Sequence, residues 1–171
     1  MTNCGAGNRQ PLVVYLDSSH QILPLSPNGV ILKDKEKSMS ELIEQKEFTP
    51  AICRRIMSDG IKKQDFSIVV HTIAQVPEGE FAKLAGTSSR TISRLNNDQI
   101  IPAHAAEVIL SVLRAFRKAA DVFGSEKKAV IWLKRPNTVL EGNTPLLLLN
   151  TRFGAEEVMD ALTRIEYGVY Y

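Results

Sequence analysis

The chain has 171 residues, of which 44% are hydrophobic and 23% are charged, a composition typical of a soluble globular protein. This length is enough for one ordinary domain, or for two small helical domains, with a buried core. The net charge of +2 is too small to indicate nucleic-acid binding by itself, so only a local concentration of basic residues would do so.

Residues 1–47 are predicted to form an N-terminal extension that contains a small β-hairpin and a linker. Residues 12–16 have the composition of a strand, and residues 30–32 could pair with them as the second arm of the hairpin. Residues 21–29 hold two prolines and an Asn-Gly pair, which indicate a loop or a second short edge element. The charge run at residues 33–37 is predicted to be a solvated face or a linker.

From Ser40 onward the apolar residues recur at helical spacing, which predicts helical structure on both sides of Pro50 and a break at residues 58–60. Residues 61–74 are predicted to form an amphipathic helix, whose buried face carries Phe66, Val69, Val70 and Ile73. His71 lies beside that face without a second potential metal ligand, so it is predicted to be a structural residue.

Two short helices are predicted at residues 80–85 and 89–96, joined by a tight turn at Gly86. Ser88 is predicted to cap the second helix with its side chain. The spacing is that of a helix-turn-helix. The apolar residues of the second helix are predicted to pack back on the first, which leaves the polar residues facing outward.

The outward face of this second helix is predicted to bind DNA. Every charged residue between Lys83 and Asn97 is basic, and arginine together with serine and threonine is the composition that a major-groove helix needs. The candidate DNA-binding residues are Lys83, Ser88, Ser89, Arg90, Thr91, Ser93 and Arg94. The alternative is a helical hairpin of the core whose arginine face is merely solvated.

A long helix is predicted from Pro102 to Val122, with Gly124 as its C-terminal cap. Its apolar residues are too many for one narrow stripe, so the helix is predicted to be covered on more than one side. This apolar surplus leads us to expect a homodimer, although burial within one chain would explain it too.

Residues 125–171 are predicted to form three short helices separated by strong stops. The first, at residues 127–134, is ended by Pro136, because the residue before a proline is disfavoured in the helical region. Thr144 is predicted to cap the second helix with its hydroxyl group. Residues 146–149 are all leucine and are therefore predicted to be buried.

The third of these helices is predicted to begin at Gly154, with Glu156 and Glu157 in its first turn, where negative charge is favourable. Its buried stripe is predicted to consist of Val158, Ala161, Leu162 and Ile165. Residues 167–168 are predicted to end the helix, and residues 169–171 are left as an aromatic tail.

Two stretches of the chain resemble one known family. The last third carries, at fixed spacing, Trp132, Leu133, Pro136, Asn137, Leu140, Gly142, Pro145, Leu148, Leu149, Thr151, Gly154, Val158, Leu162, Ile165, Tyr167 and Gly168. This pattern resembles the toxin-binding domain of the Xre/MbcA/ParS antitoxin family. The helix-turn-helix that precedes this domain in the family is similar to the pattern Phe81, Ala82, Leu84, Gly86, Ser88, Arg90, Thr91 and Arg94.

The resemblance implies a mainly α fold, in which residues 48–123 form an Xre-like helix-turn-helix domain and residues 124–171 form a small toxin-binding domain. It implies an antitoxin that neutralises a RES-domain toxin, an NAD-consuming or ADP-ribosylating enzyme, by occluding its active site. It also implies a transcriptional repressor that binds the operator DNA of its own toxin–antitoxin operon. The implied toxin-binding residues are Trp132, Pro136, Asn137, Arg152, Glu166, Tyr167, Gly168, Val169, Tyr170 and Tyr171.

The resemblance implies that the aromatic tail blocks the toxin's NAD pocket. The alternative is that the tail is only a frayed chain end without this role. Tyrosines suit this role because they are large, rigid anchors with a polar tip. Two other readings of the whole chain remain open. One is a DNA-binding transcriptional regulator without a toxin, whose C-terminal helices serve only for dimerisation. The other is an interaction protein that has kept toxin binding and lost DNA binding.

The sequence contains no recognisable catalytic motif, whether metalloprotease, nucleophile elbow, P-loop or dinucleotide fingerprint. Cys4 and Cys53 lie far apart without a Cys-x-x-Cys pattern, so neither a zinc site nor a disulfide framework is expected. We therefore expect no enzymatic activity, no cofactor, no metal and no small-molecule substrate. No apolar run approaches the ~20 residues of a membrane span and no signal sequence is recognised, so a cytoplasmic location is expected.

Overall fold

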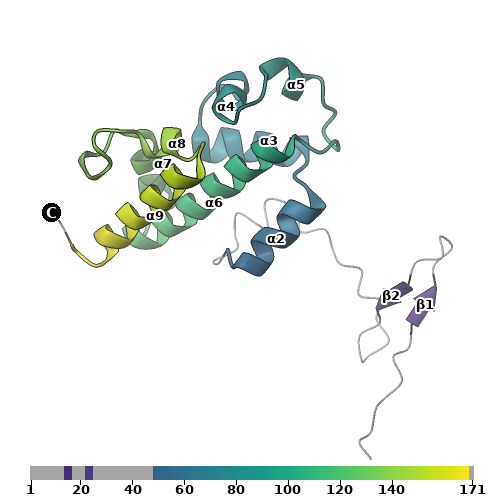
Figure 1. Cartoon of the computed structure of the whole chain (residues 1–171), viewed down its shortest axis with the longest axis horizontal. Coiled ribbons are helices and arrows are strands. Elements are labelled where there is room, and N and C mark those ends of the chain that lie inside the picture. The colour runs from purple at the N-terminus through teal and green to yellow at the C-terminus, as the bar shows by residue number, and fades with distance from the viewer. Residues whose placement is uncertain (1–13, 17–21, 25–47, 170–171) are drawn as a thin grey trace, which may run out of the picture. The chain divides into compact units, whose positions relative to one another are not determined.

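The chain divides into two compact units, Met1–Lys37 and Ser38–Tyr171. The computed structural model describes residues 14–16, 22–24 and 48–169. In the second unit the described residues form helices and connecting turns, which confirms the predicted mainly α fold (Figure 1). Among the described residues, no helix is both long enough and apolar enough to cross a membrane.

The first unit contains a two-stranded antiparallel hairpin. Its strands are β1 (Val14–Leu16) and β2 (Ile22–Pro24). β1 confirms the strand predicted within residues 12–16, and β2 is the second short edge element considered for residues 21–29. The other candidate arm, residues 30–32, lies outside the described residues.

The second unit begins with two consecutive helices separated by the predicted break. α2 (Pro50–Asp59) is capped by the hydroxyl group of Thr49 and ends at Gly60, whose φ is +79°. α3 (Lys63–Val69) continues directly as a π-helix, η1 (Val70–Ala74). The predicted amphipathic helix is therefore confirmed, and its apolar face is fully buried at Phe66, Val69, Val70 and Ile73.

Two short helices follow where the sequence predicted them, α4 (Glu78–Leu84) and α5 (Ser89–Ser93). They lie side by side at one end of the second unit (Figure 1). α5 ends before Asn96, the last residue of the predicted helix, because the chain turns there and the Gln99 side chain accepts a hydrogen bond from the Asn96 amide at 2.7 Å.

Residues 126–166 form four helical segments. They are α7 (Glu126–Lys134), the 3-10 helix η2 (Thr138–Leu140), α8 (Pro145–Leu148) and α9 (Arg152–Glu166). The buried stripe predicted for the last helix is confirmed at Val158, Ala161 and Leu162, whereas Ile165 is half-buried.

Two predictions for α8 are wrong. Thr144 occupies its N-cap position, but its hydroxyl group makes no capping hydrogen bond, and the Leu147 amide donates to the Thr144 carbonyl instead, at 2.9 Å. The four leucines are not all buried, since Leu147 is 57% exposed. α8 is a single turn, so its consecutive side chains point in different directions and cannot all face the core.

The predicted start of α9 is also wrong by two residues. The Thr151 hydroxyl accepts a hydrogen bond from the Gly154 amide at 3.1 Å, so the helix is capped at Thr151 and begins at Arg152. Glu156 and Glu157 consequently lie beyond its first turn, and no acidic residue occupies the turn where they were expected.

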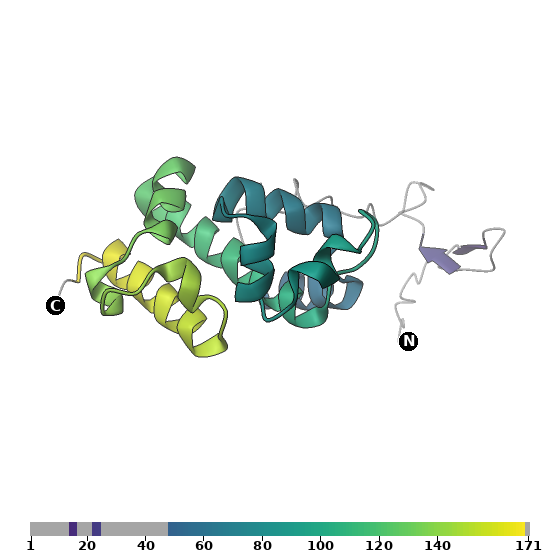
Figure 2. The ribbon, with the colours of Figure 1, turned by 90° about the horizontal axis from the view of Figure 1, so that it is seen from above.

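α6 (Ala103–Phe123) is the central helix of the second unit, and α2, α3, α7 and α9 all pack on it (Figure 2). It is covered on more than one side, as predicted, and one continuous core runs from α2 to α9. Its apolar surplus is thus buried within the chain, so the observation that suggested a homodimer has an explanation in the monomer. The homodimer stays a prediction.

Candidate functional site

α4 and α5 are held together around a tight turn. Gly86 has a φ of +66°, and a Cβ atom there would lie 2.7 Å from His104 Cδ2, so a side chain would be strained and crowded at this position. The Ser88 hydroxyl accepts a hydrogen bond from the Thr91 amide at 2.9 Å, which confirms the predicted cap. Ile92 is the buried residue of α5 and marks the side of this helix that faces the core, so the opposite side faces solvent.

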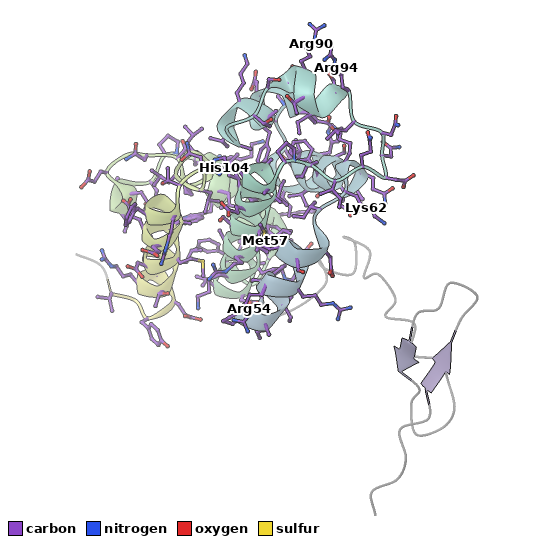
Figure 3. The ribbon with its side chains drawn as sticks, turned by 45° about the vertical axis from the view of Figure 1, so that its right-hand side comes forward. Arg54, Met57, Lys62, Arg90, Arg94 and His104 are labelled. Atoms are coloured by element: carbon purple, nitrogen blue, oxygen red, sulfur yellow. The ribbon has the colours of Figure 1, made fainter. Side chains whose placement is uncertain are left out.

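The candidate DNA-binding residues lie on α5, at its two ends and, for Lys83, on α4, and we call this set the α5 face. It consists of Lys83, Ser88, Ser89, Arg90, Thr91, Ser93 and Arg94, each of which is exposed. Arg90 and Arg94 project outward from α5 (Figure 3). Among the described residues, the three cations of the α5 face take part in no ion pair. Their charge is therefore available to an anionic partner such as phosphate.

An ion pair between a buried lysine and a half-buried glutamate fixes the start of α4 against α3. Lys63 is only 7% exposed, and its ammonium group donates to a carboxylate oxygen of Glu78 and, at 2.8 Å, to the Ser67 hydroxyl. His71 Nε2 lies 3.4 Å from the other carboxylate oxygen. Partial burial raises the pKa of Glu78, but hydrogen bonds from Lys63 and Ser67 and the nearby positive charge outweigh it. The pKa of Glu78 therefore lies below its ordinary value.

Replacing Glu78 with glutamine is expected to lower the free energy of unfolding by about 2 kcal/mol at neutral pH, because Lys63 is then buried without its counter-charge. A carboxyl group with a lowered pKa in the folded state stabilises the fold above its unfolded pKa. This contribution disappears as the pH falls through the lowered value. Urea unfolding at neutral pH and at about pH 3 should therefore show wild type and variant converging in acid.

Glu80→Gln is the matched control for this measurement, because Glu80 is exposed and lies in the same first turn of α4. It removes the same charge without disturbing a buried partner, so we expect a change of less than about 0.5 kcal/mol. A difference between wild type and Glu78→Gln that is as large in acid as at neutral pH would contradict the assigned ion pair.

A second exposed feature is a groove between the end of α6 and α7, which we call the α7 groove. Its volume is about 480 Å³, and its lining residues are Phe123, Lys128, Ile131, Trp132, Arg135, Pro136, Asn137 and Thr138. The rings of Phe123 and Trp132 pack with their centroids 5.9 Å apart. Ile131 is 50% exposed, so the groove opens to solvent over an apolar floor.

The end of α9 is a third exposed feature. Gly168 has a φ of +67°, its amide donates to the Ile165 carbonyl at 3.2 Å, and the Val169 amide donates to the Arg164 carbonyl at 2.9 Å. This pair of hydrogen bonds is a Schellman turn, which ends the helix where the sequence predicted. The Tyr167 side chain beside it is exposed, as 74% of the residue is accessible. The last two residues of the tail lie outside the described part of the chain.

The implied toxin-binding residues are divided among these places. The α7 groove is lined in part by Trp132, Pro136 and Asn137. The end of α9 carries Glu166, Tyr167, Gly168 and Val169, and Glu166 forms an ion pair with Lys118 of α6. Arg152 begins the same helix, about 20 Å from its end, and pairs with Glu156 at 3.2 Å. Arg152 therefore lies apart from the implied residues at the end of α9.

Sequence reasoning missed Lys128, Ile131 and Arg135. Together with Trp132 they recur at the i, i+3, i+4 and i+7 spacing of one helical face. A buried residue such as Leu133 lies on a different side of α7. The sequence therefore did contain a signal for an exposed apolar surface. α7 has nine residues and carries apolar side chains on two sides, so one of these sides is exposed unless two partners cover the helix.

Comparison with known proteins matches the part of the chain that holds two of these features, the α7 groove and the end of α9. Residues 118–168, which contain the α7 groove and the end of α9, match the antitoxin Xre/MbcA/ParS C-terminal toxin-binding domain. The chain is 34% identical over 127 residues to the antitoxin Xre of Yersinia enterocolitica serotype O:8 / biotype 1B, which covers 71% of this chain and 85% of that protein. It is also 34% identical over 94 residues to the antitoxin Xre of Photorhabdus laumondii subsp. laumondii, which covers 54% and 64% of the two chains.

Proposed function

Because this chain belongs to the Xre family of antitoxins, we propose that it neutralises a RES-domain toxin in the cytoplasm and represses its own operon. The toxin would be an NAD-consuming or ADP-ribosylating enzyme, as the family resemblance implies. The observation that carries the proposal is the match of residues 118–168 to a toxin-binding domain, since this part of the chain holds both the α7 groove and the exposed end of α9.

The tail that follows α9 is proposed to occlude the toxin's active site. The Schellman turn stops the helix at a defined point, directly before the tail. Tyr167 exposes most of its surface beside this turn, and exposed aromatic residues are frequent anchors in protein interfaces. An aromatic segment of this size suits a pocket that otherwise receives a nucleotide.

Deleting residues 169–171 is expected to restore toxin activity while the antitoxin remains folded. Val169 lies outside the buried core and contributes only the hydrogen bond from its amide to Arg164 at the end of α9, so the loss should be mainly in inhibition and not in stability. Growth of cells that co-express the toxin, and NAD consumption by the purified complex, measure the effect. Arg90→Ala is the control, because it changes an exposed residue far from the tail in sequence and should leave neutralisation intact. Unchanged neutralisation by the deletion variant would count against the tail.

The α5 face is proposed to bind the operator. Its two arginines can reach guanine edges or phosphates, and its serine and threonine hydroxyls can reach phosphates. If the chain binds as a homodimer, the two copies of α5 should contact half-sites about one helical turn apart, ~34 Å, or a multiple of this spacing.

Co-expression with the product of the adjacent reading frame tests the antitoxin role as a whole. A stable complex that rescues growth is the expected outcome. A DNA-binding dimer that captures no partner would instead favour a transcriptional regulator without a toxin.

A further inference from the structure

We propose that the α7 groove is the docking site for an acidic segment of the toxin that carries an exposed apolar side chain. The inference rests on the proposed function and adds to it a second contact, separate from the tail. The groove holds the toxin and supplies affinity, whereas the tail blocks the active site. The two roles make different predictions for binding and for inhibition.

The apolar part of the argument comes from the two sides of α7. Ala129 and Leu133 are fully buried and attach the helix to the core. Ile131 and Trp132 lie on the groove side, where Ile131 is half exposed and Trp132 is covered only in part, by contact with Phe123. Within the described chain this side has no covering element, so an apolar side chain of a partner would gain contacts and remove surface from water.

The charge of the rim specifies the partner. Lys128 on α7 and Arg135 directly after its end line the groove, and among the described residues neither forms an ion pair. Two cations of α6 differ in this respect, since Arg117 pairs with Glu126 at 3.2 Å and Lys118 pairs with Glu166. The two cations on the rim of the groove are therefore available to a partner, which favours an acidic one.

The shape and position of the groove favour a protein segment. Small-molecule sites bury most of their ligand, whereas Arg135 and Pro136 are exposed and the floor at Ile131 is open. The ion pair between Lys118 and Glu166 places the end of α9 beside α6, about 8 Å along that helix before Phe123. The groove and the tail are therefore near enough for one toxin to cover both.

The test compares groove variants with matched variants outside the groove. Lys128→Glu is paired with Lys127→Glu, because both lysines are exposed on α7 and only Lys128 lines the groove. Ile131→Ala is paired with Leu147→Ala, because the two aliphatic residues are 50% and 57% exposed and only Ile131 lines the groove. Binding of the purified full-length chain to the toxin is measured by calorimetry at low and high salt, after thermal melting has verified each fold.

We expect each groove variant to raise the Kd for the toxin about tenfold and each matched variant to change it less than about twofold. The salt dependence of binding should also weaken in Lys128→Glu, because one charge contact is lost. Equal effects of Lys127→Glu and Lys128→Glu, or no effect of either groove variant, would overturn the proposal. A groove variant that dissociates a dimer but still binds the toxin normally would overturn it too, by assigning the groove to a second copy of the chain.

Fluorine NMR of a fluorotryptophan-labelled chain gives a direct readout, because Trp132 is the only tryptophan in the sequence. Its signal is expected to shift when unlabelled toxin is added, and to shift equally with the chain that lacks residues 169–171. If the wild-type chain binds no toxin at all, the proposed function fails. If it binds the toxin and the Trp132 signal does not move, only the docking site fails.

Discussion

Replacing Arg90 and Arg94 together with alanine is expected to weaken operator binding about 100-fold. Both side chains project from α5 into solvent, and within the described part of the chain neither forms an ion pair (Figure 3). An arginine that contacts a guanine edge or a phosphate contributes about 1–3 kcal/mol, so the loss of two such contacts corresponds to about two orders of magnitude in Kd. Fluorescence anisotropy with DNA from upstream of the operon, at one fixed salt concentration, measures the change.

Arg54→Ala is the matched control for this experiment. Arg54 is also an exposed arginine, but it lies on α2, on the side of the second unit away from Arg90 and Arg94 (Figure 3). If the α5 face recognises the operator, Arg54→Ala should change the Kd less than about twofold, and the double variant should still neutralise the toxin. An equal loss of affinity in both variants would mean that net charge, and not the α5 face, governs DNA binding.

Replacing Gly154 with alanine is expected to destabilise the fold by about 3 kcal/mol. A Cβ atom at this position would lie 2.1 Å from the backbone oxygen of Leu148 and 2.8 Å from its carbonyl carbon. These are backbone atoms that cannot rotate away, so α8 and α9 would have to separate. Because alanine is favoured over glycine inside a helix by about 1 kcal/mol, a loss of stability can be attributed to the steric clash alone. Urea unfolding of the full chain measures it.

Gly79→Ala serves as the comparison, since Gly79 is also a helical glycine. Its added Cβ would meet the Ser89 side chain at 3.3 Å and not a backbone atom, so a small shift of Ser89 relieves the contact. We expect a change within about 1 kcal/mol. If Gly154→Ala proved as stable as Gly79→Ala, the close packing of α8 on α9 would be wrong.

The features that could be predicted from the sequence depend on local chemistry. The Ser88 cap, the turn at Gly86 and the stop at Gly168 each follow from a residue type that satisfies nearby backbone groups. The buried face of α3 follows from a period that only a helix explains. Local rules also failed at Thr144 and Thr151, since two threonines of equal capping propensity both occupy N-cap positions and only the Thr151 hydroxyl accepts a capping hydrogen bond.

The parts of the site that could not be predicted join residues that are distant in the sequence. Lys63 and Glu78 are separated by 15 residues, and nothing in either segment indicates that α3 and α4 would bring them together. The α7 groove needs Phe123 from the end of α6 to close against Trp132. Such contacts are set by how helices pack in three dimensions, which the helical period alone does not specify.

The continuous core described for the second unit has a consequence for timing. α6 and its neighbours form one cluster of buried residues within one compact unit. The α5 face and the α7 groove therefore belong to the same folding unit. A cooperative unfolding event removes both surfaces at once. If the two proposed activities hold, repression and neutralisation are lost together, and the unfolding rate of the second unit sets how long both last.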